Sequence, residues 1–182
     1  MGFGLDDKNP DRYSVDVGQA GLGMPDRDYY LKPDAKFAET RVKYRAYIEQ
    51  MLKLANYPNA GPAADAIMAV EMKIAEMQWP IEKLRDVELS YNPKSLAELK
   101  AAAPEFAWDE ALKASGIPNQ NFFLLRNPEP VAKLAKLFRS TPVETRSPGS
   151  SISWENRTGR SPALAVRASW LNVISARTAS RS

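Results

Sequence analysis

The sequence predicts a mainly α-helical fold with a small N-terminal β-hairpin, and at most an α+β organisation. Two long segments repeat apolar residues at three- and four-residue spacing, which is the period of an amphipathic helix. A short segment near the N-terminus alternates apolar and polar residues instead, as a strand does. Fourteen Pro among 182 residues predict many helix ends. This length suits one domain, or one domain followed by a tail.

Two short strands are expected at the N-terminus, over residues 3–7 and 13–17. Tyr13, Val15 and Val17 alternate with polar residues, so they should share one face of a strand. The linking stretch Lys8–Asp11 is rich in residues that favour turns. Together these features predict a hairpin.

The next segment, Gln19–Leu31, holds two Gly and a Pro within five residues, which argues against a regular element. Its Gly-x-Gly is a weak signal for a phosphate-binding loop, because no third Gly and no strand–loop–helix context follow. We expect an ordered structural loop instead. Gly21 and Gly23 should allow backbone turns, and Tyr29 and Tyr30 should pack on the helices.

Two long helices should follow and form an antiparallel pair joined by Tyr57–Gly61. The first begins at Pro33 and Asp34, where the Asp34 carboxylate can cap, and stops near Asn56. The second begins after Gly61 and Pro62 and ends or kinks at Pro80. The apolar positions are Phe37, Val42, Tyr44, Ile48, Met51, Leu52 and Leu54 in the first helix, and Ile67, Val70, Ile74 and Met77 in the second.

Three shorter helices and one strand complete the body. Ser95–Ala102 starts with a capping-box pattern, since Glu98 follows Ser95 by three residues. Trp108–Ser115 is a further helix, and Phe122–Leu125 reads as a short buried strand. The last helix, Glu129–Phe138, places its apolar residues on one side, namely Val131, Leu134, Leu137 and Phe138.

The chain divides into a body, residues 1–145, and a tail, residues 146–182. The tail holds six Arg, no Lys and one acidic residue, Glu155, whereas the body has a net charge of −2. Its apolar residues show no clean period, so we expect it to be disordered. A nucleic-acid or lipid contact by this basic tail, and glycosylation at Asn156, are disfavoured alternatives. No nucleic-acid partner and no membrane span are expected.

The composition excludes several kinds of catalytic centre. With no His and no Cys, the chain lacks imidazole bases, thiolates and the commonest zinc ligands. The clusters that remain have simpler interpretations. Asp26–Asp28 should form a local salt bridge rather than an acid–base pair, and Asp6, Asp7 and Asp11 lack EF-hand spacing and belong to the hairpin turn. Core packing is expected for Trp79, Trp108, Met24, Met51, Met68, Met72 and Met77.

Several segments together match the pattern of one known family. The most specific is Gly21–Leu31 within Gln19–Leu31, because so many adjacent positions fit. The others are Asp6–Tyr13, Ala69–Glu76, Tyr91–Pro93, Leu96–Leu99 and Pro104–Trp108. On these segments, over residues 2–145, the chain resembles the N-terminal region of the neprilysin and endothelin-converting enzyme family of zinc metalloendopeptidases.

This resemblance implies a fragment of a larger, two-lobed peptidase that is secreted, periplasmic or held on the outer face of the plasma membrane. The family's catalytic lobe carries H-E-x-x-H, in which two His bind zinc and the Glu acts on zinc-bound water. That motif lies beyond the matching region. No catalytic, cofactor-binding or metal-binding residue is therefore assigned here, and no cofactor is expected in this chain.

The sequence departs from the family pattern at both ends. Met1–Asp7 shows no signal peptide, so the localisation of this chain stays unknown. After Thr141–Thr145 the family would continue into an apolar helix, whereas this chain turns to Arg146–Ser150. An out-of-frame reading of GC-rich DNA would give such a tail. The absence of Cys resembles bacterial members of the family.

Three functional hypotheses follow from these observations. The first is a piece of a zinc endopeptidase that contributes to the lobe enclosing peptide substrates, inactive alone, with a missing catalytic lobe as its partner. The second is a stand-alone helical peptide-binding module. The third is a non-functional gene remnant. Whether the chain is an enzyme by itself is left open at this point.

Overall fold

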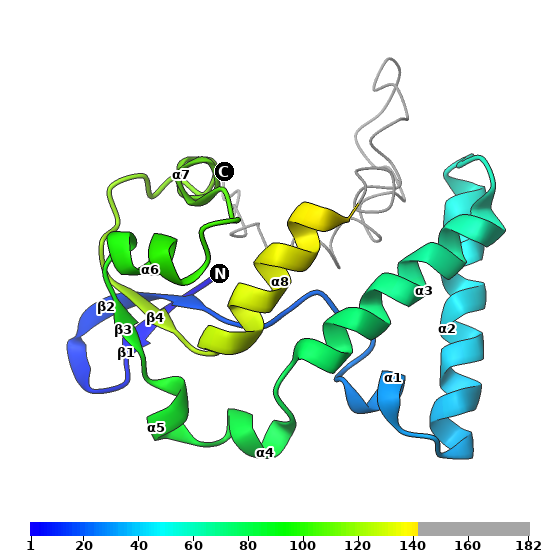
Figure 1. Cartoon of the computed structure of the whole chain (residues 1–182), viewed down its shortest axis with the longest axis horizontal. Coiled ribbons are helices and arrows are strands. Elements are labelled where there is room, and N and C mark those ends of the chain that lie inside the picture. Colours follow the sequence, from blue (N-terminus) through cyan, green and yellow to red (C-terminus); the bar gives the residue numbers. More distant parts are fainter. Residues whose placement is uncertain (142–182) are drawn as a thin grey trace. The chain divides into compact units, whose positions relative to one another are not determined.

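The computed structural model describes residues 1–141 (Figure 1). These residues form two compact units. The sheet unit comprises Met1–Ala20 and Trp79–Ser140, and the helical unit comprises Gly21–Gln78. The predicted boundary at residue 145, the disordered tail, the Asn156 sequon and the frameshift all lie outside the described residues.

The expected hairpin forms one half of the sheet. β1 (Gly2–Asp6) pairs antiparallel with β2 (Asn9–Val17), with Phe3 opposite Val15 and Leu5 opposite Tyr13. The turn is tighter than predicted, because β2 already begins at Asn9. Tyr13 shares its face with Val15, but it is 76% exposed where Val15 is 2% exposed. The hairpin therefore extends beyond the buried part of the sheet.

Two short strands from later in the chain complete the sheet. β4 (Phe123–Leu125) confirms the predicted buried strand and runs parallel to β2, while β3 (Pro93–Lys94) pairs antiparallel with β4. The order is β1-β2-β4-β3. β3 was not predicted, because a two-residue strand beginning with Pro carries no local strand pattern.

Three helices accompany this sheet, namely α6 (Leu96–Ala102), α7 (Trp108–Ala114) and α8 (Pro128–Ser140). Their buried residues Leu99, Leu112 and Val131 share one core cluster with Val15 and Phe123. All three helices were predicted within one or two residues at each end. The predicted α8 face is confirmed at Val131 and Leu134, whereas Leu137 and Phe138 are only half-buried.

Helix ends in the sheet unit follow local capping rules. The predicted capping box is present: the Glu98 amide donates to Ser95 Oγ (3.3 Å), and the Ser95 amide donates to Glu98 Oε2 (2.8 Å). Two one-turn helices, α4 (Ile81–Leu84) and α5 (Val87–Ser90), were not predicted. They are too short to show a helical period. Asp86 starts α5 by accepting a hydrogen bond from the Leu89 amide (3.0 Å).

The helical unit contains α1 (Asp28–Leu31), α2 (Ala35–Leu54) and α3 (Ala60–Met77). The predicted helix pair is confirmed, since Ile48 and Leu52 of α2 share a core cluster with Ala64 and Ile67 of α3. α1 corrects the prediction that this stretch lacks a regular element, because one helical turn forms directly after the loop.

The predicted start of α2 is wrong in one detail. The Asp34 side chain makes no capping hydrogen bond. Its backbone carbonyl accepts from the Ala38 amide (2.9 Å), as an N-cap carbonyl does in any helix. At the other end of the pair, α3 begins at Ala60, three residues before the expected start after Pro62. It follows Asn59, whose φ of 57° lies in the left-handed region.

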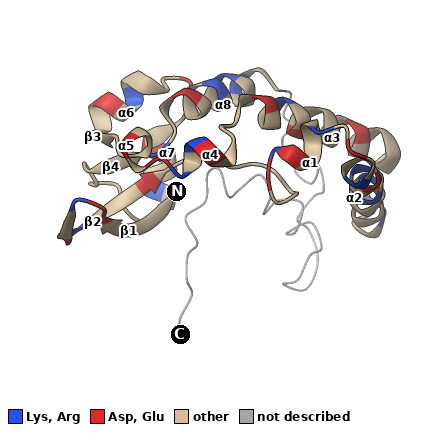
Figure 2. Ribbon diagram, turned by 90° about the horizontal axis from the view of Figure 1, so that it is seen from below, with Lys and Arg blue, Asp and Glu red and all other residues tan. Residues whose placement is uncertain are grey.

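α2 carries charged residues of both signs (Figure 2). Arg45 ties α2 to α3, because its Nε donates to Asp65 Oδ1 (2.8 Å) and it also pairs with Glu49. These contacts raise the pKa of Arg45, chiefly through the hydrogen bonds that it donates to Asp65 and Glu49. Among the described residues, none of the helices is long and apolar enough to cross a bilayer.

Candidate functional site

A buried carboxylate organises the helical unit. Glu71 on α3 is 1% exposed. Its Oε2 accepts a hydrogen bond from the Tyr30 hydroxyl (2.6 Å), and its Oε1 accepts one from Tyr44 (3.1 Å). Burial, followed by the neighbouring Glu71 carboxylate, raises the pKa of both tyrosines above the ordinary value of 10.0. Both phenols therefore stay protonated near neutral pH and donate to Glu71.

The Gly21–Leu31 segment closes around the same tyrosine. The Tyr30 oxygen accepts hydrogen bonds from the amides of Gly23 (3.1 Å) and Met24 (2.9 Å). Gly21 takes a φ of 100°, which favours glycine. The expectation of an ordered loop with Tyr30 packed on the helices is thus confirmed, and Tyr29 likewise makes an edge contact with Phe37 of α2.

Side chains of the Asp26–Asp28 cluster also form hydrogen bonds with backbone groups. Asp26 Oδ1 accepts from the Asp28 amide (2.8 Å), and Arg27 Nε donates to the Ala75 carbonyl of α3 (3.1 Å). A local ion pair does form, but it joins Asp28 to Lys32 (2.7 Å), which lies outside the cluster named in the prediction. The charged residues of this cluster thus hold the loop in place, and no acid–base pair forms.

Close approach explains the second glycine of the loop. A Cβ built on Gly23 would lie 1.7 Å from the Tyr44 hydroxyl oxygen, which itself bonds Glu71. We therefore expect Gly23→Ala to displace Tyr44 and to lower the free energy of unfolding by about 1–3 kcal/mol. The control is Gly61→Ala in α3, where a new Cβ would meet only atoms at 3.7 Å or more. Urea unfolding followed by circular dichroism should show a loss for Gly23→Ala alone. Equal stability of the two variants would contradict the close approach.

A side-chain amide joins distant segments of the sheet unit. Gln19 Oε1 accepts from the Trp79 amide (2.8 Å), and Gln19 Nε2 donates to the Trp79 carbonyl (3.1 Å). The Gln19 amide itself donates to Oδ1 of buried Asn127 (3.0 Å). Gln19 thus pairs with Trp79 as a neighbouring strand would. No local sequence pattern predicts these partners, which lie 60 and 108 residues away.

The three N-terminal aspartates have separate partners. Asp6, with a side chain 0% exposed, accepts from Arg12 Nε (3.0 Å) and from the Lys8 amide (3.1 Å). Asp7 pairs with Arg126, and exposed Asp11 has its backbone amide bonded to Asn9. They do not converge, and only Asp7 lies in the hairpin turn. Asp6 ends β1 and accepts from the turn amide of Lys8, and Asp11 lies in β2, which corrects its assignment to the turn.

Asp6 should make stability depend on acid pH. Burial alone would raise its pKa, but hydrogen bonds from Arg12, the Lys8 amide and Tyr91 outweigh burial and hold the pKa below 3.8. A lowered folded-state pKa means that Asp6 contributes stability above about pH 4, and that this contribution is lost as the pH falls through the folded-state value. In Asp6→Asn, the decline in Tm between about pH 5 and pH 2 should be shallower than in the parent. Parallel declines would contradict this assignment.

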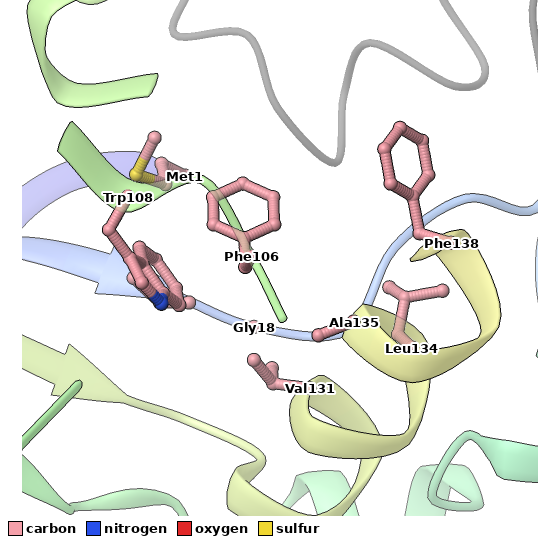
Figure 3. A pocket seen from close by; sticks show the side chains of 9 residues that line it. Met1, Gly18, Phe106, Trp108, Val131, Leu134, Ala135 and Phe138 are labelled. Atoms are coloured by element: carbon pink, nitrogen blue, oxygen red, sulfur yellow. The ribbon is translucent and has the colours of Figure 1, made fainter. Parts of the chain in front are cut away.

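An apolar hollow of about 30 Å³ lies in the sheet unit (Figure 3). Side chains of Phe106, Trp108, Val131, Leu134 and Phe138 line it. This volume suits one or two water-sized groups. The lining side chains include no titratable group, but Met1 also lines the hollow, and burial lowers the pKa of its α-amino group.

The predicted core roles of Trp and Met are only partly confirmed. Trp108 is buried, and its Nε1 donates to the Ala103 carbonyl (2.9 Å). Met24 is buried as well. Trp79 is only half-buried, with the Lys83 ammonium 4.9 Å from its ring centre. Met72 corrects the prediction, because it is 39% exposed on the outer side of α3.

The described residues do not fit a zinc centre. The sequence has no His and no Cys. Within residues 1–141, no three acidic side chains gather where they could share a metal ion. Glu71, the most buried carboxylate of the helical unit, accepts hydrogen bonds from two tyrosines. The absence of catalytic, cofactor-binding and metal-binding residues from this chain stays a prediction. The side chains described above stabilise the fold.

The described residues form a mainly helical body with a small sheet, in which polar side chains hold loops against helices. Residues 1–152 match the model of Peptidase family M13 in its N-terminal region, and the chain belongs to this family. The match confirms the resemblance drawn from Gln19–Leu31.

Specific relatives agree with this assignment. Human endothelin-converting enzyme-like 1 is 28% identical over 144 residues, which cover 76% of this chain and 18% of that protein. Rat endothelin-converting enzyme 1 is 34% identical over 119 residues, or 62% of this chain and 15% of that protein. The zinc metalloprotease Zmp1 of Mycobacterium tuberculosis, in complex with an inhibitor, gives a TM-score of 0.72 at 25% identity. That match covers 93% of this chain and 30% of Zmp1.

Proposed function

We propose that this chain supplies part of the substrate-enclosing lobe of a zinc metalloendopeptidase, and that it hydrolyses no peptide by itself. The family assignment supports the first statement. The chain spans 15–18% of the two curated relatives and 30% of Zmp1, so the activity of the whole peptidase requires residues outside this match.

The metal-binding side chains available in this sequence support the second statement, that the chain alone hydrolyses no peptide. Zinc peptidases hold the metal with His and carboxylate ligands and use the metal-bound water as the nucleophile. This sequence contains no imidazole. The buried carboxylates of the described residues, Asp6 and Glu71, already accept hydrogen bonds from Arg12, Tyr30 and Tyr44. The buried carboxylates of this chain therefore stabilise the fold of the proposed lobe.

Metal analysis tests the absence of a zinc centre. The purified chain, incubated with zinc and desalted, should retain well below one zinc per chain. A variant of Glu71, the best-buried carboxylate, should retain the same small amount. One tightly held zinc per chain would contradict the proposal.

Complementation tests the lobe role. An M13 peptidase lacking the segment that matches residues 1–141 should gain peptide hydrolysis when this chain is supplied as a separate polypeptide. The matched control is this chain carrying Trp108→Ala, whose core is disrupted. Equal hydrolysis with both chains would contradict a specific structural contribution.

A further inference from the structure

The longest run of consecutive exposed residues in the described part of the chain is Ile81–Leu89, in the sheet unit. The run contains α4 and α5, and neither of these one-turn helices buries a residue. Even its aliphatic side chains lie in solvent, since Ile81 is 47% exposed and Val87 is 57% exposed. Little apolar burial therefore opposes the opening of this segment, and we expect it to unfold locally more readily than the core elements.

The contacts that hold this run in place lie at the surface. Asp86 caps α5 by accepting a hydrogen bond from the Leu89 amide (3.0 Å). Glu88 pairs with Lys8 of the hairpin turn (3.2 Å), and the two side chains are 80% and 49% exposed. An ion pair as exposed as this one adds little stability. The cap of α5 is therefore an important local barrier to opening.

Two basic residues, Lys83 and Arg85, lie within this exposed run. Most other basic residues of the described part lie in α2, α3, α8 or the sheet. Cleavage at those positions would require a long helix or a strand ladder to open first, whereas a single helical turn opens with the loss of very few backbone hydrogen bonds. Exposed segments that open in this way are the preferred sites of proteolytic nicking.

We propose that the peptide bond after Lys83 or Arg85 is a site of limited proteolysis by an endoprotease that cuts after basic residues. Hydrolysis breaks the C–N bond, and water supplies a hydroxyl to the carbonyl carbon and a proton to the nitrogen. The nicked chain stays folded because both pieces contribute to one core. β2 in the first piece pairs with β4 in the second, and Val15 shares a core cluster with Phe123.

Limited digestion of the full 182-residue chain with trypsin tests this proposal. Mass spectrometry of samples taken over time identifies each cut, and cuts after residue 141 are counted separately. Within residues 1–141, the first cut should follow Lys83 or Arg85. The double variant Lys83→Gln with Arg85→Gln should lose this cut, whereas Lys136→Gln, at an exposed position of α8, should be cut as the parent is. Gel filtration should elute both pieces of the nicked parent together, and urea should separate them.

A matched pair of variants at Asp86 tests whether local opening controls the cut. Asp86→Ala and Asp86→Asn both remove the charge that follows Arg85, but only Asn can still cap α5. Asp86→Ala should therefore be cut about fivefold faster than Asp86→Asn. A first cut elsewhere within residues 1–141 would overturn the proposal. Pieces that separate without urea, or equal cutting of the two Asp86 variants, would do so too.

Discussion

Replacing Glu71 by Leu is expected to lower the free energy of unfolding of the helical unit by about 2–4 kcal/mol. Leu fills a similar volume but accepts no hydrogen bond. The hydroxyl of Tyr30, a side chain 1% exposed, would lose its acceptor at 2.6 Å, and the half-buried Tyr44 would lose its own at 3.1 Å. Each buried donor left without a partner is destabilising. The Gly23 and Met24 amides, which donate to Tyr30, should loosen with it.

Urea unfolding followed by far-ultraviolet circular dichroism measures this loss, because α2 and α3 dominate the helical signal of this unit. Glu76→Leu is the matched control, since Glu76 lies exposed on the same helix and should change stability by less than about 0.5 kcal/mol. The double variant Tyr30→Phe with Glu71→Leu should lose less than the sum of the two single variants. Strict additivity would show that the two side chains do not act as a pair.

Trp108→Ala is expected to cost about 3–5 kcal/mol in the sheet unit. Trp108 is 4% exposed and packs on Phe106 with ring centres 4.4 Å apart. Its loss opens a cavity beside β4 and leaves the Ala103 carbonyl without the indole donor at 2.9 Å. Both effects act in the same direction.

Tyr13→Ala is the control for Trp108→Ala, because Tyr13 is a large aromatic residue of the same unit that is 76% exposed. It should shift the unfolding midpoint little. Thermal unfolding by calorimetry compares the two variants without relying on the removed tryptophan. Similar midpoints for both would contradict the assignment of Trp108 to the core.

Local sequence patterns were sufficient for much of this fold. The long helices, the hairpin, the Ser95 capping box and β4 each follow from residues close together in the chain. The patterns failed where the partner is distant. β3 exists because β4 lies beside it, and Tyr13 is exposed because no helix covers that end of β2. Asp34 takes the N-cap position of α2, but its side chain makes no capping hydrogen bond.

The functional interpretation had the same limit. The absence of imidazole and thiol groups could be read from composition. The role of Glu71 could not, because a glutamate within an otherwise amphipathic helix looks like any solvated residue. Only the fold brings it to Tyr30 and Tyr44. These contacts explain why the Gly21–Leu31 segment is so specific. Gly21 allows a turn, Gly23 allows a close approach, and Met24 makes an apolar contact. Arg27 and Tyr30 make hydrogen bonds that fasten this loop to α3.

Peptide hydrolysis by the pure chain tests the central claim most directly. The chain should be incubated with zinc and a library of internally quenched fluorescent peptides, after a final purification step that removes contaminating proteases. The account predicts cleavage no faster than in buffer, with and without zinc. Zinc-dependent turnover that follows the chain through purification and disappears with a chelator would contradict it.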